Sequence, residues 1–583
     1  MVKNMPNFSI CKRLLLVFSG LLVLSLPQVF AQTSKQSAEI VPTEDEVYHF
    51  LHQLRVSGLV PSYQHETRPT DRGTILTLLE SLQTERQKLS TTQWQWLQYF
   101  HKTFAEKPED RQTVLEKGTG NHADRTYFRI PLAQDTEKYF YYNQTDDWRF
   151  VAELQGKAQF RVAQDKPNTY RGLGVQPYVT LRGDYRGKLG FYSSTFDGWQ
   201  LSSAPNRKAL AYDPELRNLF YISYYMTHGL NPEGSFDRTS ASLRWRKEAF
   251  MAEIANERLN LGATFSDPII LSSESDYYPF ARVGLATSKV RYQFIHARIS
   301  QPSVWEQDPQ NPSFGLLRAP QRYLGVHRVE ISPRPSYRIA FSEMVVYANR
   351  SLELGYLNPL FPFKTSEHAQ WDQDNALFAI ETTIRLKPKW EGHLVFLADD
   401  LSFALIGKQS YHVKWALQTG VGYALDFGLL SLEYTRVEPF TYTHRFSQNG
   451  YYFNAYEHNG FALGHPIGPN ADQWLMTFKG WFPKRIRGEV RLGYNRQGEN
   501  YTDAQGALVN VGGDLLNGGL SDVALATYRK IFLSGNVRKG PTAAFLLTYE
   551  PLRGLKLRAT GWLERWDKTP TQGFAKAEFV VDF

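Results

Sequence analysis

The stretch FAKAEFVVDF, residues 574–583, alternates side chains of opposite character with a period of two. One face of the predicted strand carries Ala575, Ala577, Phe579, Val581 and Phe583, and the other carries Lys576, Glu578, Val580 and Asp582. Chain ends are usually polar and frayed. A terminal strand with an apolar face therefore needs a partner on each edge and an apolar surface to face.

The same alternation continues through most of the chain after residue 124. In GLKLRATGWLERW, residues 554–566, Leu555, Leu557 and Leu563 share one face, and Lys556, Arg558 and Glu564 share the other. Short connections such as Asp426-Phe427-Gly428 alternate with long ones such as residues 349–373 and 439–472. Strands of about ten residues with short turns on one side and long loops on the other are typical of bacterial outer-membrane barrels.

We therefore predict a mainly β protein, a transmembrane antiparallel β-barrel of roughly 18 to 20 strands. Residues 574–583 would be its closing strand, paired with the first strand so that no sheet edge is left open. A terminal aromatic on such a strand resembles the sorting signal for barrel insertion. A soluble sandwich would also alternate, but the length of the array and the aromatics near strand ends, such as Tyr139–Tyr142, favour a membrane barrel.

The composition agrees with a barrel. The chain has 13 Trp, 33 Tyr and 37 Phe, yet its mean hydropathy is only −0.42, as alternating strands require. A formal net charge of +8 in 583 residues is mild and does not suggest a nucleic-acid partner.

Residues 1–31 have the pattern of a cleaved signal peptide. Lys3, Lys12 and Arg13 precede an apolar run, residues 14–26, which is too short to span a membrane as a helix. The only cysteine, Cys11, would leave with this segment, which suits an oxidising envelope. We expect the protein in the outer membrane of a Gram-negative bacterium.

Residues 32–115 are predicted to form a small helical bundle, ahead of a barrel over residues 116–583 with long extracellular loops. Apolar residues recur at helical spacing in residues 46–58, 71–83 and 93–106. Thr43, Thr70 and Thr92 are the expected helix caps. Such a bundle buries little surface alone, so we expect it to dock on something larger.

Two parts of the chain resemble the Wzi-like capsule assembly family, in the version found in Bacteroidetes-type bacteria. One is the helical segment; the other is the middle of the barrel, with the order His327-Arg328, Ser342-Glu343, Leu357-Asn358-Pro359, Asp374-Asn375 and Asp399-Asp400. The resemblance implies an eighteen-stranded barrel plugged by loops, with a helical bundle at one end. It also implies binding of capsular polysaccharide at the cell surface, without chemistry.

A polysaccharide site needs aromatic faces and hydrogen-bonding groups on exposed loops. Residues 439–472 and their flank fit best, and the candidates are Tyr442, Arg445, Tyr451, Tyr452, Asn454, Tyr456 and Trp474. The alternative is that this loop folds inward as a plug and its aromatic rings pack on one another.

A second set of polar residues lies in the middle strands: Arg328, Glu330, Glu343, Asp374, Asn375, Glu381, Asp399 and Asp400. We expect them to line the lumen as a salt-bridged network, because buried charges of opposite sign normally pair. Glu343 and Glu381 could instead act as paired carboxylates in glycoside hydrolysis. The histidines lack metal-ligand spacing, so no metal is expected. The sequence shows no nucleophile elbow, phosphate loop or dinucleotide fingerprint, so neither a cofactor nor enzyme activity is expected.

The leading hypothesis is an outer-membrane barrel that binds surface polysaccharide and assists capsule or exopolysaccharide assembly or anchoring. Its partners would be the polysaccharide, membrane lipid and periplasmic export or assembly components. It predicts a plugged lumen. The alternative, a porin for small solutes, predicts an open lumen and gives the helical bundle no evident task.

Overall fold

The computed structural model describes residues 37–117, 126–128, 134–219, 222, 234–301, 304–308, 311–318, 321–369, 373–401, 409–444, 453–520 and 528–583. These residues belong to one compact unit, Lys35–Phe583. The predicted signal peptide lies outside them.

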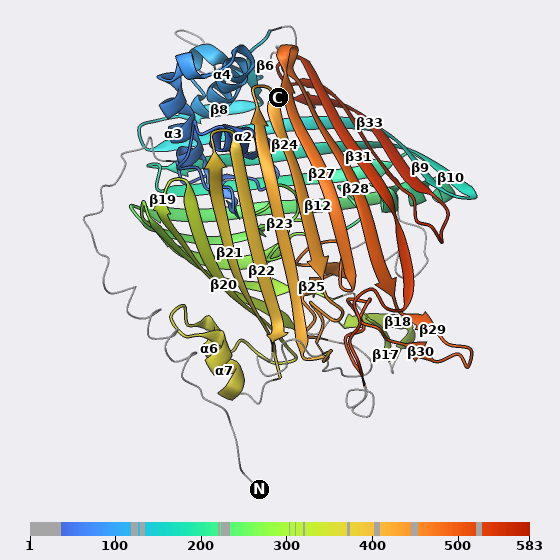
Figure 1. The fold of residues 1–583 in the computed structure, drawn as a ribbon. Helices are drawn as coiled ribbons and strands as arrows, with labels where there is room; N and C mark the ends of the chain where they lie inside the picture. The colour runs from blue at the N-terminus through green and yellow to red at the C-terminus, as the bar shows by residue number, and fades with distance from the viewer. Residues whose placement is uncertain are drawn as a thin grey trace. The chain divides into compact units, whose positions relative to one another are not determined.

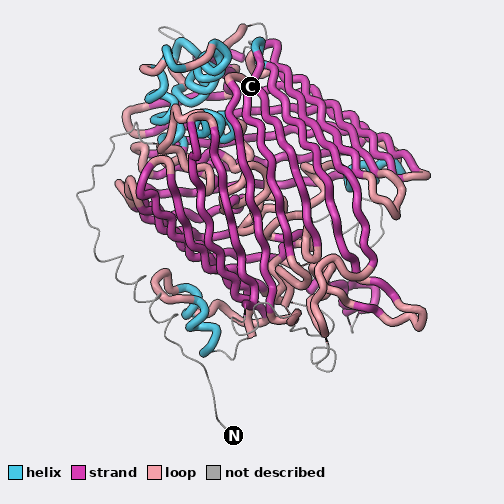
Figure 2. The backbone as a smooth tube through the Cα atoms, in the orientation of Figure 1, coloured by secondary structure: helices cyan, strands magenta, loops and turns pink. Residues whose placement is uncertain are grey.

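Eighteen antiparallel strands of the described chain close into a barrel, as predicted (Figures 1 and 2). They are β9 (Trp148–Asp165), β10 (Asn168–Tyr185), β11 (Leu189–Gln200), β12 (Ser235–Lys247), β13 (Phe250–Glu257), β15 (Tyr278–Ala286), β16 (Val290–Ile299), β19 (Arg322–Arg334), β20 (Tyr337–Ala348), β21 (Asn375–Lys387), β22 (Trp390–Leu401), β23 (Val413–Leu425), β24 (Gly428–Val437), β27 (Ala471–Phe482), β28 (Ile486–Glu499), β31 (Asn536–Leu552), β32 (Leu555–Glu564) and β33 (Gln572–Asp582).

The C-terminal strand closes the barrel, which confirms the prediction for residues 574–583. β33 pairs with β32 on one edge and with β9 on the other, where Ala575 lies opposite Val162. The short strand β8 (Tyr141–Gln144) pairs with the rest of the same β9 edge. All strands of the wall therefore have a partner on both sides, so backbone groups in the membrane are satisfied internally.

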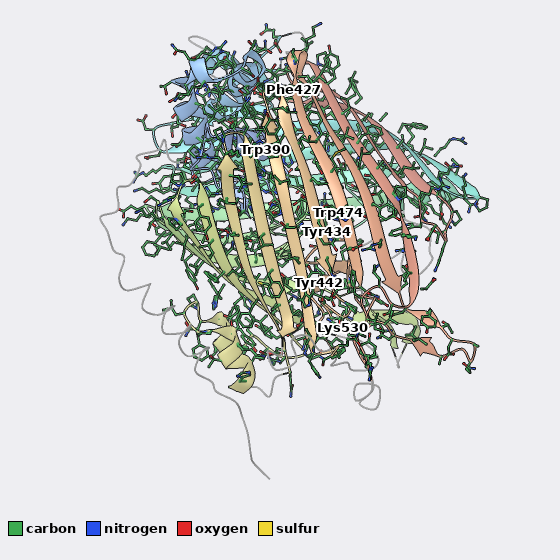
Figure 3. All side chains as sticks on the ribbon, in the orientation of Figure 1. Trp390, Phe427, Tyr434, Tyr442, Trp474 and Lys530 are labelled. Carbon is green, nitrogen blue, oxygen red and sulfur yellow. The ribbon has the colours of Figure 1, made fainter. Side chains whose placement is uncertain are left out.

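Side chains alternate between the lumen and the outside of the wall. In β33, Lys576 and Glu578 are buried inside, whereas Phe579 is exposed on the outside. Aromatic residues lie on the outer surface at two levels (Figure 3). Trp390 lies near the end with short turns. Tyr434 packs against Trp474 farther along the strands, with ring centroids 4.7 Å apart. This arrangement is that of interfacial aromatic girdles around an apolar band.

No helix in the described part of the chain is long and apolar enough to cross a membrane.

The two ends of the barrel differ in their connections. At the short-turn end, strands are joined by tight turns such as Arg186-Gly187, where both residues have positive φ. At the long-loop end, the connections carry small elements: η4 (Ala204–Tyr212), β14 (Asn260–Leu261), β17 (Val304–Asp308), β18 (Asn311–Arg318), α6 (Leu354–Leu357), α7 (Phe363–Ala369), β25 (Glu457–His458), β26 (Phe461–Ala462), β29 (Tyr501–Thr502) and β30 (Leu508–Val509).

The helices α2 (Val47–Val56), α3 (Arg72–Gln83) and α4 (Thr91–Ala105) lie at the short-turn end (Figure 1). They share one apolar core, which includes Trp481 of the barrel wall. The predicted caps are wrong, and α2 has Glu46 at its N-cap position without a side-chain cap. Asp71 caps α3, and Ser90 forms a capping box with Gln93 at α4, whereas Asp45 accepts a hydrogen bond from the first residue of α2. The bundle is docked on the barrel as expected.

The lumen is filled by segments that enter from opposite ends. β2 (Thr67–Arg68) follows α2 from the short-turn end, and β14 belongs to the long loop between β13 and β15. The two strands pair inside the barrel, with Leu261 opposite Thr67. A buried apolar cluster joins this loop to inward wall residues such as Val326 and Leu377. The structure therefore has the plugged lumen that the resemblance implied.

Candidate functional site

A polar cleft opens among the loops of the long-loop end. Its volume is about 510 Å³, and its walls come from the connections β11–β12, β13–β15, β24–β27 and β28–β31. The polar and aromatic lining residues are Arg217, Glu274, Phe461, Gln497, Glu499, Asn500 and Asp514. A cleft of this size, with amide, carboxylate and guanidinium groups beside one ring, suits a small polar ligand or a few sugar units.

The charged groups of the cleft remain partly accessible. Arg217 Nη2 lies 3.3 Å from Glu274 Oε2, and both side chains are about a third exposed or more, at 41% and 32%. Glu499 contacts Arg538 at 3.0 Å. Exposed ion pairs contribute little to stability, so these groups can exchange their partners for the hydroxyls of a ligand.

Asn470 holds the loops around the cleft together. Its buried side chain donates to Gly498 O at 2.8 Å and to Ser534 O at 3.1 Å, and its Oδ1 accepts from Leu533 N at 2.8 Å. Asn470 also has a positive φ of 55°, which Asn tolerates better than most residues. Sequence reasoning missed this residue. The only signal was the Gly-Pro-Asn turn in the loop.

The predicted loop residues are divided between the plug, the wall and the part of the chain that the structure leaves undescribed. Tyr442 and Tyr456 are fully buried, with ring centroids 5.8 Å apart, and their hydroxyls donate to Ile269 O and Ile270 O at 2.8 and 2.7 Å. Burial raises the pKa of both hydroxyls. These two residues therefore belong to the plug and pack on one another, as in the alternative given for this loop.

The other candidates of this loop are not gathered around a ligand site. Asn454 is buried and donates to Gln373 O at 2.7 Å. Trp474 faces outward from β27 and is exposed on the lipid side of the wall. Arg445, Tyr451 and Tyr452 lie outside the described residues.

Part of the predicted lumen network forms one cluster. Arg328 Nε donates to Glu330 at 2.8 Å and Nη1 donates to Ser342 Oγ at 3.0 Å, and Arg328 also pairs with Glu381. The two acids reach both plug segments: Glu330 accepts from the Thr67 hydroxyl, and Glu381 accepts from Ala263 N at 3.1 Å. This cluster lies where β2 and β14 meet.

Asp374, Asn375 and Asp399 have hydrogen-bond partners outside the Arg328 cluster. Asp374 accepts from Arg350 at 3.0 Å and from Tyr356 at 2.7 Å, while the Asn375 side chain donates to Asn454 O. Asp399 accepts from Tyr442 N at 2.5 Å. The side chain of Asp400 lies outside the described residues.

Glu343 and Glu381 do not form a carboxylate pair. Glu343 points outward from β20 and contacts His327, whereas Glu381 points into the lumen beside Arg328. Because they lie on opposite faces of the wall, they cannot flank one glycosidic bond.

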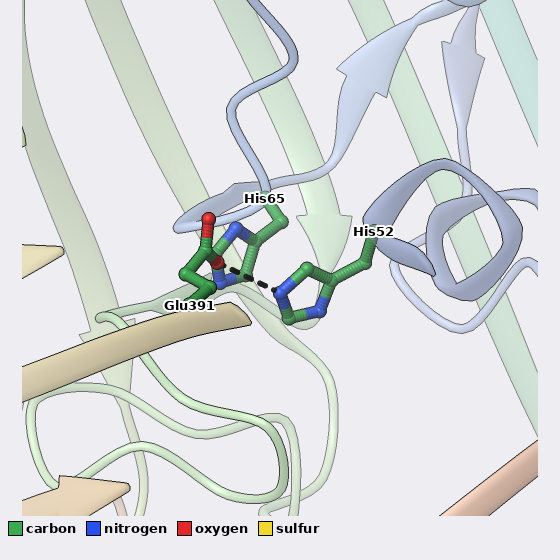
Figure 4. Close-up of side chains that lie close together, drawn as sticks. All are labelled: His52, His65 and Glu391. Atoms are coloured by element: carbon green, nitrogen blue, oxygen red, sulfur yellow. Dashed lines mark hydrogen bonds and ion pairs between the residues drawn. The ribbon is translucent and has the colours of Figure 1, made fainter. Parts of the chain in front are cut away.

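A cluster of three residues, His52, His65 and Glu391, connects α2 and the segment after it to strand β22 of the wall (Figure 4). The imidazole rings are stacked with centroids 3.7 Å apart, and His52 Nε2 lies 3.3 Å from Glu391 Oε1. Two imidazoles and a carboxylate are ligands that suit zinc. However, Arg55 donates to His65 Nδ1 at 2.5 Å and pairs with Glu391 at 2.9 Å. Arg55 thus supplies the cation of this cluster, and burial lowers the pKa of both histidines.

No protein-family model matches the chain, and no curated protein matches its sequence. Among solved structures, the Escherichia coli protein described as Wzi, an outer-membrane protein involved in group 1 capsule assembly and a carbohydrate-binding β-barrel, superposes with a TM-score of 0.55 at 12% identity. The match covers 94% of this chain and 100% of that protein.

Two further similar structures superpose less well. Acinetobacter baumannii OccAB4 has a TM-score of 0.42 at 10% identity, over 76% of this chain and 99% of that one. Pseudomonas aeruginosa OprD has a TM-score of 0.40 at 11% identity, over 74% and 95%. The chain is therefore an outer-membrane β-barrel of eighteen strands with the fold of Wzi, which confirms at the level of fold the resemblance found in the sequence.

Proposed function

We propose that this barrel binds surface polysaccharide and assists the assembly or anchoring of a capsule or exopolysaccharide layer, without catalysing a reaction. The observation that carries the proposal is the combination of a filled lumen with a polar cleft among the long loops. The fold of a carbohydrate-binding capsule protein supports the same function. In this reading, the cleft holds sugar units through the exposed Arg217–Glu274 pair and the ring of Phe461.

The long-loop end faces the cell exterior in this proposal, and the helices face the periplasm. Bacterial barrels place short turns in the periplasm and long loops outside. The bundle would then be available to periplasmic export or assembly components. The porin alternative requires a continuous aqueous path, and the packed segments within the described lumen give it no support.

The first test is a deletion in the host, complemented with variants of the cleft. Cell-bound and shed polysaccharide are quantified for the wild type and for a triple variant, Arg217→Ala, Glu274→Ala and Phe461→Ala. We expect polysaccharide to be made in equal amount but to move from the cells into the medium, both in the deletion strain and with the variant.

The matched control replaces an ion pair at the opposite end. Arg186 lies 2.7 Å from Asp147 in a short turn, and both are exposed. A double variant, Arg186→Ala and Asp147→Ala, is expected to retain polysaccharide like the wild type. Unchanged retention in the deletion strain would overturn the proposed function, and a loss in the control variant alone would move the site to the short-turn end.

A further inference from the structure

The connection between β20 and β21 packs against the outside of the barrel. We call residues 349–369 the wall cover; they include α6 and α7, which Figure 1 shows beside the wall, toward the long-loop end. Phe363 of the wall cover is fully buried and stacks on His327 of β19, with centroids 4.0 Å apart and an interplanar angle of 18°. A Cβ atom at Gly325 would lie only 2.9 Å from the Phe363 ring, so the wall is shaped to receive it.

The wall cover shields polar groups that point out of the barrel. Glu343 accepts from Lys364 N at 2.9 Å and lies 3.4 Å from His327 Nδ1. Nearby, His296 Nε2 and the Tyr347 hydroxyl are 2.9 Å apart. Outward polar groups without a partner are costly next to hydrocarbon. The wall cover supplies partners to these groups and places aromatic rings over them.

The register of the strands gives the level at which the wall cover lies. His327 is opposite Glu343, which is opposite Phe378 in β21. Phe378 and Ile380 point outward and are exposed, so they belong to the apolar band of the wall. The polar patch under the wall cover therefore borders the band that faces lipid.

The outer surface of the wall cover is itself apolar. Leu354 and Leu360 are 79% and 73% exposed, and Leu352 and Phe361 are exposed as well. Such a concentration of large apolar side chains on a short segment is unusual for a surface in water. The apolar surface of the wall cover adjoins Phe378 and Ile380 on the outside of the barrel. We therefore expect the same surroundings, membrane lipid, for the wall cover and for these two residues.

We propose that the wall cover is an interfacial element whose exposed apolar side chains insert into the acyl-chain region of the outer leaflet. The occupant of this surface is membrane lipid, because the surface continues the lipid-facing band of the wall. Its polar backbone and charged side chains can remain at headgroup level, as in interfacial amphipathic segments. The inference is independent of the ligand of the cleft.

Nitroxide accessibility tests the proposal directly. In a Cys11→Ser background, which has no other cysteine, single cysteines replace Leu354 or Leu360 and are spin-labelled after reconstitution into dimyristoylphosphatidylcholine vesicles. Ile380→Cys is the lipid-facing reference, and Leu508→Cys, on an exposed loop strand, is the aqueous reference. We expect labels at positions 354 and 360 to be relaxed severalfold more by oxygen than by a water-soluble nickel complex, as at position 380.

Two outcomes would overturn the proposal. One is nickel accessibility at both positions equal to that of the position 508 label. The other is strong dipolar broadening between labels at position 354, which would make a second copy of the chain the occupant.

Photoactivatable phosphatidylcholine with the diazirine on its acyl chain provides a measurement on the unsubstituted chain. We expect crosslinks within residues 352–361 and none within residues 501–509.

Discussion

At the residue scale, Arg55 is the side chain that joins the bundle, the plug and the wall. Its guanidinium lies 2.7 Å from Glu66 Oε1 and 2.9 Å from Glu391 Oε2, and all three side chains are buried. Its pKa is raised by the two carboxylates even though burial, the largest effect, opposes the charged form. Arg55 is therefore the cation that the two acids share, and Glu66 is also paired with Arg338.

We predict that Arg55→Met destabilises the protein strongly. Removing one partner of a buried ionic cluster leaves uncompensated charge, at a cost of about 3 to 5 kcal/mol. The measurement is the midpoint of guanidinium unfolding in detergent, followed by tryptophan fluorescence. Lys88→Met is the control, since Lys88 is exposed and its ion pair with Glu85 lies within its own turn; we expect a change below about 0.5 kcal/mol. Equal effects of the two variants would contradict the role of Arg55.

A second residue-scale prediction concerns pH and His458 in the plug. His458 Nδ1 accepts from Ser300 N at 2.8 Å, and Nε2 donates to Tyr277 O at 3.2 Å, so the neutral ring satisfies both partners. Burial lowers the pKa of His458 to about 4. Because the unfolded residue titrates near 6.5, the unfolded state binds the extra proton first, and the free energy of unfolding falls as the pH drops from about 6.5 to 4.

His458→Asn keeps an acceptor near the Nδ1 position but cannot titrate. Between pH 6 and 4.5, we expect the slope of the unfolding free energy against pH to be smaller in this variant by up to about 1.4 kcal/mol per pH unit. The measurement is a series of denaturant titrations at fixed ionic strength. Identical slopes for the wild type and the variant would show that His458 takes up its proton equally in both states.

At the element scale, alternation predicted the barrel because the membrane imposes it. In β33 and β32 the lipid-facing side must be apolar, so Phe579 and Leu557 are visible in the sequence as a period of two. The long loops obey no such period. Tyr442 and Tyr456 look like exposed sugar-binding aromatics, but their position depends on contacts with Ile269 and Ile270, which are 173 and 186 residues away in sequence.

The candidate cleft could not be predicted for the same reason. Arg217 and Glu274 come from separate connections and Glu499 from the end of β28, and only the closure of the barrel brings these segments together. The Arg328 cluster was partly predictable, because Arg328 and Glu330 of β19 and Glu381 of β21 share the inward face of the wall, with only β20 between the two strands. Its partners Thr67 and Ala263 belong to the plug and had no signal in the strand pattern.

One element-scale prediction tests how tightly the inward loop is packed. A Cβ atom at Gly464 would lie 2.4 Å from Cζ of the Tyr442 ring, which is itself fully buried. Gly464→Ala should therefore displace Tyr442 and destabilise the plug by about 1 to 3 kcal/mol. Protease cleavage within residues 453–470 measures the release of the loop. Gly156→Ala, where a Cβ meets nothing within 4 Å, should leave cleavage unchanged.

At the scale of the whole molecule, the plug is built from both ends of the barrel. The bundle delivers β2 from the short-turn end, while β14 and residues 453–470 enter from the long-loop end. Glu274, in the loop that contains β14, also lines the cleft. A ligand bound in the cleft would therefore contact the loop that contains β14. Because β14 pairs with β2 of the N-terminal segment, this loop connects the two ends of the barrel.

The last prediction concerns conductance in planar bilayers. An eighteen-stranded wall is wide enough for an aqueous channel once its plug is gone. The full chain should show no stepwise conductance. Deleting residues 37–117, or replacing residues 259–276 and 439–469 with short Gly-Ser linkers, removes one half of the plug each time. Each change alone should produce at most small, irregular currents, because the other half still occupies the lumen.

Combining both changes should give large, uniform steps. Circular dichroism and the heat-dependent shift in electrophoretic mobility must first show that each variant retains a closed barrel. Large steps from the unmodified chain would instead identify an open pore and favour the porin function. Uniform steps after only one of the two changes would show that a single segment plugs the barrel. Steps that require both changes would establish that the β2–β14 pair closes the lumen from two sides, as the register of these strands indicates.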